Sequence, residues 1–229
     1  MKPKTIQLLV SVQNAEEAAL VMDLGVDCID IKNPSVGSLG RPTFEVVDEV
    51  VNLVADKVPL SAALGEFSEE HDTLDVRLLK LPLRYLKWGL SKLGWPMPFV
   101  NHVREVNGFG RMIGAAYADA KICDAPSLPK VACLASRLNA PVFLIDTFQK
   151  DGRSLFAHVS VAEIEHLREM AFWGDMELAL AGSVKWEELP EIKRIRPNWL
   201  AVRGLVCQEG DRRKPIDPER VKRLKQLLN

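Results

Sequence analysis

Short apolar runs alternate with segments of helical period along the whole chain. We predict eight strands, at residues 6–11, 27–32, 59–64, 84–90, 111–118, 141–146, 177–182 and 199–204. Strands that alternate with amphipathic helices form βα units on a parallel sheet. Eight such units in a chain of this length predict a closed (β/α)8 TIM barrel, because a doubly wound open sheet would usually contain fewer strands.

Several of the intervening helices have recognisable start signals. Asn14 can cap a helix that begins at the next residue, and Asp217 followed by Pro218 can open the last helix. Ser160 and Glu163 have the spacing of a capping box. The segments between the third and fifth strands are polar or interrupted by proline, so we expect less regular helices there.

Composition restricts the classes of protein to which this chain can belong. The 229 residues are 47% hydrophobic and 27% charged, which is typical of a globular protein, and we expect residues 1–229 to form one TIM-barrel domain. The formal net charge of −1 argues against a nucleic-acid partner. No apolar run approaches the roughly 18 to 20 residues of a membrane span, so we expect no membrane partner and a cytoplasmic location. Four scattered cysteines without a histidine cluster predict neither a disulfide framework nor a metal site.

Polar residues stand at the C-terminal ends of the predicted strands, where a packed barrel would prefer valine or isoleucine. They are Asp30, Lys32, Lys87, Tyr117, Asp119, Asp146, Lys150 and Arg203. Catalytic residues of TIM barrels lie at this end of the strands. An unpaired ion in a dry barrel would cost several kcal/mol, so these residues form either an internal ion-pair network or a functional site. The convergence of three lysines favours function.

Lysine is the most informative residue type in this set. Burial and neighbouring cations can make a lysine amine neutral, and a neutral amine can attack a carbonyl group to form a Schiff base. Clustering Lys32, Lys87 and Lys150 would lower the pKa of each amine. Asp30 lies two residues before Lys32 on the same side of the strand and works against this effect, because a carboxylate favours the charged amine. We therefore expect Asp30 to orient groups or transfer protons.

The connections after the last two predicted strands predict an anion site. Gly182 and Ser183 lead from the seventh strand towards a helix, and Arg203 and Gly204 end the eighth. Backbone amides at a helix start together with an arginine can bind phosphate, and barrels frequently bind phosphate at these two loops. The alternative is that Ser183 only caps its helix and Gly204 only permits a turn. The lysine cluster favours the anion site.

Six motifs spread over nearly the whole chain narrow the interpretation. They are DCIDIKNPSVGSLG at 27–40, YLKWGL at 85–90, GAAYADA at 114–120, LIDTFQKDGRSLF at 144–156, LALAGSVK at 178–185 and VRGLVCQEGDR at 202–212. Together they resemble the (5-formylfuran-3-yl)methyl phosphate synthases of methanofuran biosynthesis. The resemblance implies a barrel related to class I aldolases that condenses two molecules of glyceraldehyde 3-phosphate, with loss of phosphate and water. It also implies that neither a metal nor an organic cofactor takes part.

The resemblance also assigns roles to individual residues. Lys32 matches the lysine that forms the Schiff base, and Lys87 matches a proton-accepting lysine. Asp30, Asp146 and Lys150 match the supporting charged residues. Two phosphorylated trioses require two anion sites, and Lys150 or the loop after Lys32 is the candidate for the second.

Some expectations depend on where this sequence departs from the family pattern. The segments GEFSEEHDTLDVRLLKLP and SKLGWPMP differ from the archaeal members, which suggests a bacterial branch. We expect a homo-oligomer whose only other partner is its small-molecule substrate. Two alternatives remain open: a class I aldolase or triose-phosphate lyase of another specificity, and a barrel that binds phosphorylated sugars without catalysis.

Overall fold

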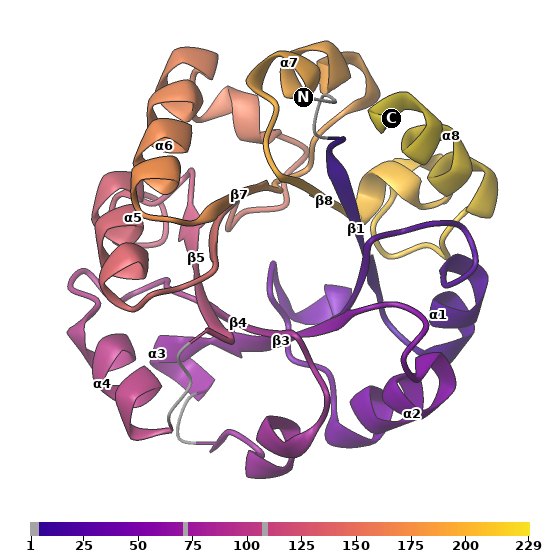
Figure 1. Ribbon diagram of the computed structural model, residues 1–229, viewed down its shortest axis with the longest axis horizontal. Helices are drawn as coiled ribbons and strands as arrows, with labels where there is room; N and C mark the ends of the chain where they lie inside the picture. The colour runs from indigo at the N-terminus through magenta and orange to yellow at the C-terminus, as the bar shows by residue number, and fades with distance from the viewer. Residues whose placement is uncertain (1–4, 71–72, 107–109) are drawn as a thin grey trace.

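The protein folds as a closed ring of eight parallel strands surrounded by helices (Figure 1). A computed structural model describes residues 5–70, 73–106 and 110–229. The strands are β1 (Gln7–Val12), β2 (Cys28–Ile31), β3 (Leu60–Glu66), β4 (Tyr85–Gly89), β5 (Met112–Tyr117), β6 (Val142–Asp146), β7 (Glu177–Leu180) and β8 (Trp199–Val202). Each strand pairs in parallel with the next, and β8 pairs with β1 to close the barrel. The prediction of a (β/α)8 barrel is confirmed, with each strand within two residues of its predicted start.

Helices cover the outside of this barrel. The α-helices are α1 (Ala15–Val21), α2 (Phe44–Val54), α3 (Phe67–Glu70), α4 (Met97–Glu105), α5 (Leu128–Arg137), α6 (Val161–Trp173), α7 (Leu189–Ile195) and α8 (Pro218–Leu228). Short 3-10 turns are η1 (Pro34–Val36), η3 (Val76–Lys80), η4 (Leu155–Ala157), η5 (Trp186–Glu188), η6 (Gly204–Val206) and η7 (Gln208–Gly210). In the described residues no helix is long and apolar enough to cross a membrane.

The predicted helix starts are confirmed. The side chain of Asn14 accepts a hydrogen bond from the amide of Glu17 at the start of α1. Ser160 accepts one from the amide of Glu163 in α6, and Asp217 caps α8. Each cap satisfies an amide that the helix itself leaves without an acceptor. The region after β3 is irregular, as expected, with the short α3 and the turn η3 in place of a full helix.

Alternation along each strand separates two cores. In β2, Cys28 and Asp30 face the barrel interior, whereas Ile29 and Ile31 pack against the surrounding helices. In β4, Lys87 faces inward, and the fully buried Trp88 packs outward against Phe67 and His102. This two-residue period places polar side chains inside the barrel without disturbing the apolar layer under the helices.

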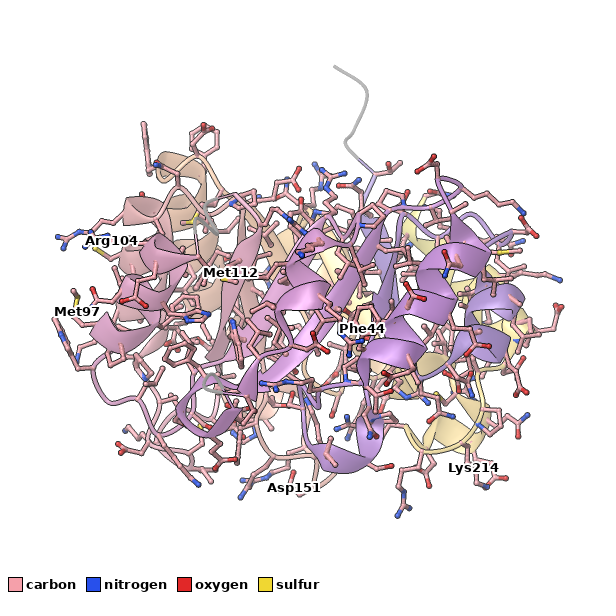
Figure 2. The ribbon with its side chains drawn as sticks, turned by 90° about the horizontal axis from the view of Figure 1, so that it is seen from below. Phe44, Met97, Arg104, Met112, Asp151 and Lys214 are labelled. Atoms are coloured by element: carbon pink, nitrogen blue, oxygen red, sulfur yellow. The ribbon has the colours of Figure 1, made fainter. Side chains whose placement is uncertain are left out.

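All eight loops that follow the strands meet at one end of the barrel. Figure 2 shows Asp151 and Lys214, from the loops after β6 and β8, at the same lower edge of the molecule. Small side chains occupy the inner face of β7 and β8 near this end, where Ala181 and Ala201 border an open space. The fold therefore leaves room for a ligand at the C-terminal ends of its strands.

Candidate active site

A cavity of about 420 Å³ opens at the C-terminal ends of the strands. The predicted site residues that line it are Asp30, Lys32, Lys87, Asp146, Lys150, Gly182, Ser183, Arg203 and Gly204. The structure thus brings all nine together around one space, although they are spread over most of the chain. Tyr117 and Asp119 lie beside this cavity and do not line it.

Asp30 and Lys87 form a buried ion pair at the base of the cavity. The amine of Lys87 lies 2.5 Å from the carboxylate of Asp30, and both side chains are buried. Asp30 also accepts hydrogen bonds from the hydroxyls of Ser61 (2.8 Å) and Ser11 (3.0 Å). With its carboxylate oxygens satisfied from three strands, Asp30 is held in one orientation.

Asp146 and Lys150 form a second pair across the cavity from the first. The amine of Lys150 lies 2.8 Å from Asp146 and 3.0 Å from the hydroxyl of Thr147. Asp146 also accepts hydrogen bonds from the hydroxyl of Ser38 (2.9 Å) and the amide of Thr147 (2.7 Å). Although burial opposes ionisation, Lys150 and Lys32 lower the pKa of Asp146 to about 2. This carboxyl group is therefore ionised at neutral pH.

Lys32 differs from the other two lysines. It follows the last residue of β2, and its amine has no hydrogen bond or ion pair to any residue in the described part of the chain. The pKa of Lys32 is lowered to about 7, with burial as the largest cause; Asp146 and Asp30 raise it, and Arg212 and Lys150 act in the same direction as burial. Burial and neighbouring cations were both expected to lower this pKa, and burial is the larger cause. A substantial fraction of this amine is neutral at pH 7, as a nucleophile requires.

The two predicted phosphate loops adopt conformations that suit close approach of a ligand. Gly182 has φ +99°, and a Cβ atom there would lie 3.0 Å from the methyl group of Thr147. Ser183 has φ +50°, and neither its amide nor that of Gly204 donates to an acceptor among the described residues. We expected a helix to start at Ser183, but the turn η5 intervenes and α7 begins only at Leu189. The exposed amides therefore belong to turns and not to a long helix.

Arg203 lines the cavity, but the donors of its guanidinium group, which we expected to bind an anion, contact groups of the protein itself. It forms a buried ion pair with Glu17 of α1, with an N–O distance of 2.7 Å. Its remaining donors reach the carbonyl oxygens of Ser11 (3.0 Å) and Arg212 (2.6 Å). This arginine consequently ties the loop after β8 to β1 and α1.

Arg212 is a site residue that the sequence reasoning missed. Its guanidinium group lines the cavity and donates a hydrogen bond of 2.7 Å to the carbonyl oxygen of Gly37, in the loop after β2. Burial lowers the pKa of Arg212, while the charge of Asp146 raises it. The only available signal was its place in the motif that ends at residue 212.

Two further groups outside the cavity support its walls. The carboxylate of Asp119 accepts hydrogen bonds from the amides of Phe148 (2.7 Å) and Gln149 (2.9 Å), which fixes the loop that carries Lys150. The hydroxyl of Tyr117 donates a hydrogen bond to Glu66. Glu66 also accepts hydrogen bonds from the hydroxyl and the amide of Ser91, which follows β4. Burial and the adjacent carboxylate raise the pKa of Tyr117 well above its usual value, so it stays protonated.

The fold and the site together define an enzyme-like TIM barrel with lysines and carboxylates at its mouth. Solved structures share this fold. Phosphoribosyl anthranilate isomerase from Thermus thermophilus has a TM-score of 0.65 at 17% identity, covering 97% of this chain and 98% of that chain. KGPDC from Streptococcus mutans has a TM-score of 0.62 at 13% identity, covering 97% of both chains.

Sequence relatives identify the family. The model of the 4-HFC-P synthase family matches residues 8–225. Proteins named (5-formylfuran-3-yl)methyl phosphate synthase are 32% identical in Methanosarcina mazei, over 96% of this chain and 97% of the relative, and 32% identical in Methanopyrus kandleri, over the full length of both. The chain belongs to the 4-HFC-P synthase family, as its motifs predicted. These relatives are archaeal, and the bacterial branch stays a prediction.

Proposed function

We propose that the protein condenses two molecules of glyceraldehyde 3-phosphate to (5-formylfuran-3-yl)methyl phosphate through a Schiff base on Lys32. One observation carries this proposal: of the three lysines predicted to converge at the strand ends, Lys32 is the one whose amine has no ion-pair partner among the described residues. The amines of Lys87 and Lys150 are each engaged in an ion pair with a carboxylate, at 2.5 and 2.8 Å. Lys32 is therefore the amine best suited to attack a carbonyl carbon.

The bonds and protons of this reaction balance. The nitrogen of Lys32 bonds to the carbonyl carbon of one triose phosphate, after its isomerisation to the ketone, and the carbonyl oxygen leaves as water. Loss of a proton from the adjacent carbon gives an enamine, which adds to the aldehyde carbon of the second triose. Elimination of one phosphate, ring closure, loss of two further waters and hydrolysis of the C–N bond restore the amine. The net products are the furan, one phosphate and two waters.

The two ion pairs are suited to the proton transfers. Each pair supplies an acid and a base to the cavity that Lys32 lines, and a pair can give up or accept a proton without creating a lone buried charge. Lys87 with Asp30 lies at the base of the cavity, and Lys150 with Asp146 lies at its wall. We assign the protons at the carbon skeleton to the first pair and those at the leaving phosphate to the second.

Reduction by borohydride in the presence of glyceraldehyde 3-phosphate tests this function. We expect mass spectrometry of peptides to find a triose adduct on Lys32, and ultraviolet absorbance to show furan formation when borohydride is omitted. The variant Lys32→Ala should give neither. Lys57→Ala is the matched control, because Lys57 is an exposed lysine between α2 and β3 at the opposite end of the barrel.

Other outcomes separate the alternatives. An adduct on Lys32 without any furan would favour a class I aldolase or triose-phosphate lyase of another specificity. An adduct on Lys87 or Lys150 would reassign the nucleophile. Neither adduct nor furan with the unmodified protein would reject catalysis and leave a barrel that only binds phosphorylated sugars.

A further inference from the structure

Arg212 connects two loops at the cavity mouth whose strands, β8 and β2, are separated only by β1. It belongs to the loop after β8, and its guanidinium group reaches the carbonyl oxygen of Gly37 in the loop after β2. That contact uses one nitrogen, and in the described residues the other two make no hydrogen bond. Arg212 is half-buried and lines the cavity. A partly desolvated guanidinium group with free donors that face a cavity is well suited to bind an anion.

The backbone of Arg212 lies beside Gly204, whose amide donates to no acceptor among the described residues. A Cβ atom added at Gly204 would lie 3.2 Å from the carbonyl oxygen of Gly210 and 3.7 Å from Cβ of Arg212. The carbonyl oxygen of Arg212 accepts a hydrogen bond from Arg203, which itself is held by Glu17. The backbone of Arg212 is thus tied to a buried ion pair, next to the predicted phosphate loop at Gly204.

We propose that Arg212 binds the substrate phosphate and makes the enzyme select phosphorylated trioses. This inference deepens the proposed function and rests on it. A guanidinium group binds two oxygens of one phosphate through parallel N–H donors, which a lysine cannot do. An unphosphorylated triose offers no such anion, so it would leave the buried cation without a partner.

The same cation acts on Lys32. The charged groups that face Lys32 are Asp30 from β2, Lys87 from β4, Asp146 and Lys150 from β6 and its loop, and Arg212 from the loop after β8. Among these, Arg212 is one that lowers the pKa of Lys32, so its removal should raise that pKa. A purely mechanical link between the two loops would have no such effect.

The test compares Arg212→Gln with Arg213→Gln. Arg213 is the neighbouring arginine, which is exposed and paired with Asp211, so its loss should change neither readout. At about pH 9, above the pKa of Lys32, we expect Arg212→Gln to slow borohydride trapping of glyceraldehyde 3-phosphate by about 10- to 100-fold, as for loss of a charge-assisted hydrogen bond, and to leave trapping of glyceraldehyde nearly unchanged. The pH at which trapping of glyceraldehyde reaches half its maximum should rise in Arg212→Gln and stay constant in Arg213→Gln.

A second measurement, of phosphate binding, does not depend on Schiff-base formation. Inorganic phosphate should bind to the unmodified protein and to Arg213→Gln in calorimetry, and its affinity should fall about 10- to 100-fold in Arg212→Gln. Equal phosphate binding by Arg212→Gln, or equal slowing of both trioses, would overturn the inference. If the unmodified protein traps the triose phosphate and forms no furan, the proposed product fails while the role of Arg212 stands.

Discussion

The buried pair of Arg203 and Glu17 allows the sharpest prediction about stability. Replacing Arg203 with methionine removes a guanidinium group that is 5% exposed and makes four hydrogen bonds, two of them to Glu17. Methionine fills much of the same volume with apolar atoms. Glu17, itself 3% exposed, is then left as a buried carboxylate whose only other partner in the described part of the chain is the amide of Gln13.

The magnitude follows from the geometry. At the N–O distance of 2.7 Å the attraction is about 6 kcal/mol for an effective dielectric constant of 20. Desolvation of both charges offsets part of this attraction, and removal of one partner from a buried pair costs about 3 to 5 kcal/mol. For a chain of this size, we expect Tm to fall by about 6 to 20 °C.

Thermal and urea unfolding of three variants would measure this effect. Arg203→Met should be strongly destabilised, and the double variant Arg203→Met with Glu17→Met should recover much of the loss because no lone charge remains. Arg213→Met should leave Tm unchanged, since its ion pair is exposed. If Arg203→Met kept its Tm and lost phosphate binding, Arg203 would be a phosphate ligand, and our interpretation of the Arg203–Glu17 pair as a structural contact would be refuted.

Three further predictions concern the site. Trapping of triose by Lys32 should weaken about tenfold per pH unit below pH 7. The free energy of unfolding should rise from pH 7 to 10.5, because in this range the unfolded chain binds more protons at Lys32 than the folded chain does. Lys32→Met should lack that rise in urea titrations. Gly182→Ala should lose about 1 to 2 kcal/mol in urea unfolding, because φ is +99° and the new methyl group would crowd Thr147; an unchanged midpoint would contradict this. Asp119→Ala should lower kcat for furan formation by about 10- to 100-fold, since the loop that carries Lys150 loses its anchor; an unchanged kcat would show that Asp119 has no positioning role.

The order of strands and helices was predictable because it depends on local pattern. Apolar runs of strand length alternate with capped amphipathic segments, and the structure places each strand within two residues of the predicted start. The inward direction of Asp30 and Lys87 also followed, since side chains alternate along a strand whatever its neighbours are. Polar residues at strand ends were therefore sufficient to indicate where the cavity would be.

The partners of those residues depended on contacts between distant segments. Arg203 was predicted to bind an anion, and its neighbour turned out to be Glu17, 186 positions away in the chain. Arg212 acquired its place at the mouth through a carbonyl group 175 positions away. No local pattern specifies such pairs, because closing the barrel is what brings β8 beside β1.

The three lysines also differ in a way that only partly followed from the sequence. The sequence by itself determined that three lysines and two aspartates would converge at the strand ends, because the period of a parallel strand and the geometry of a barrel require it. Only the tertiary structure decided that Lys87 and Lys150 each contact a carboxylate and Lys32 does not. The pKa of an amine depends on desolvation and on charges a few ångströms away, and those distances exist only in the folded chain.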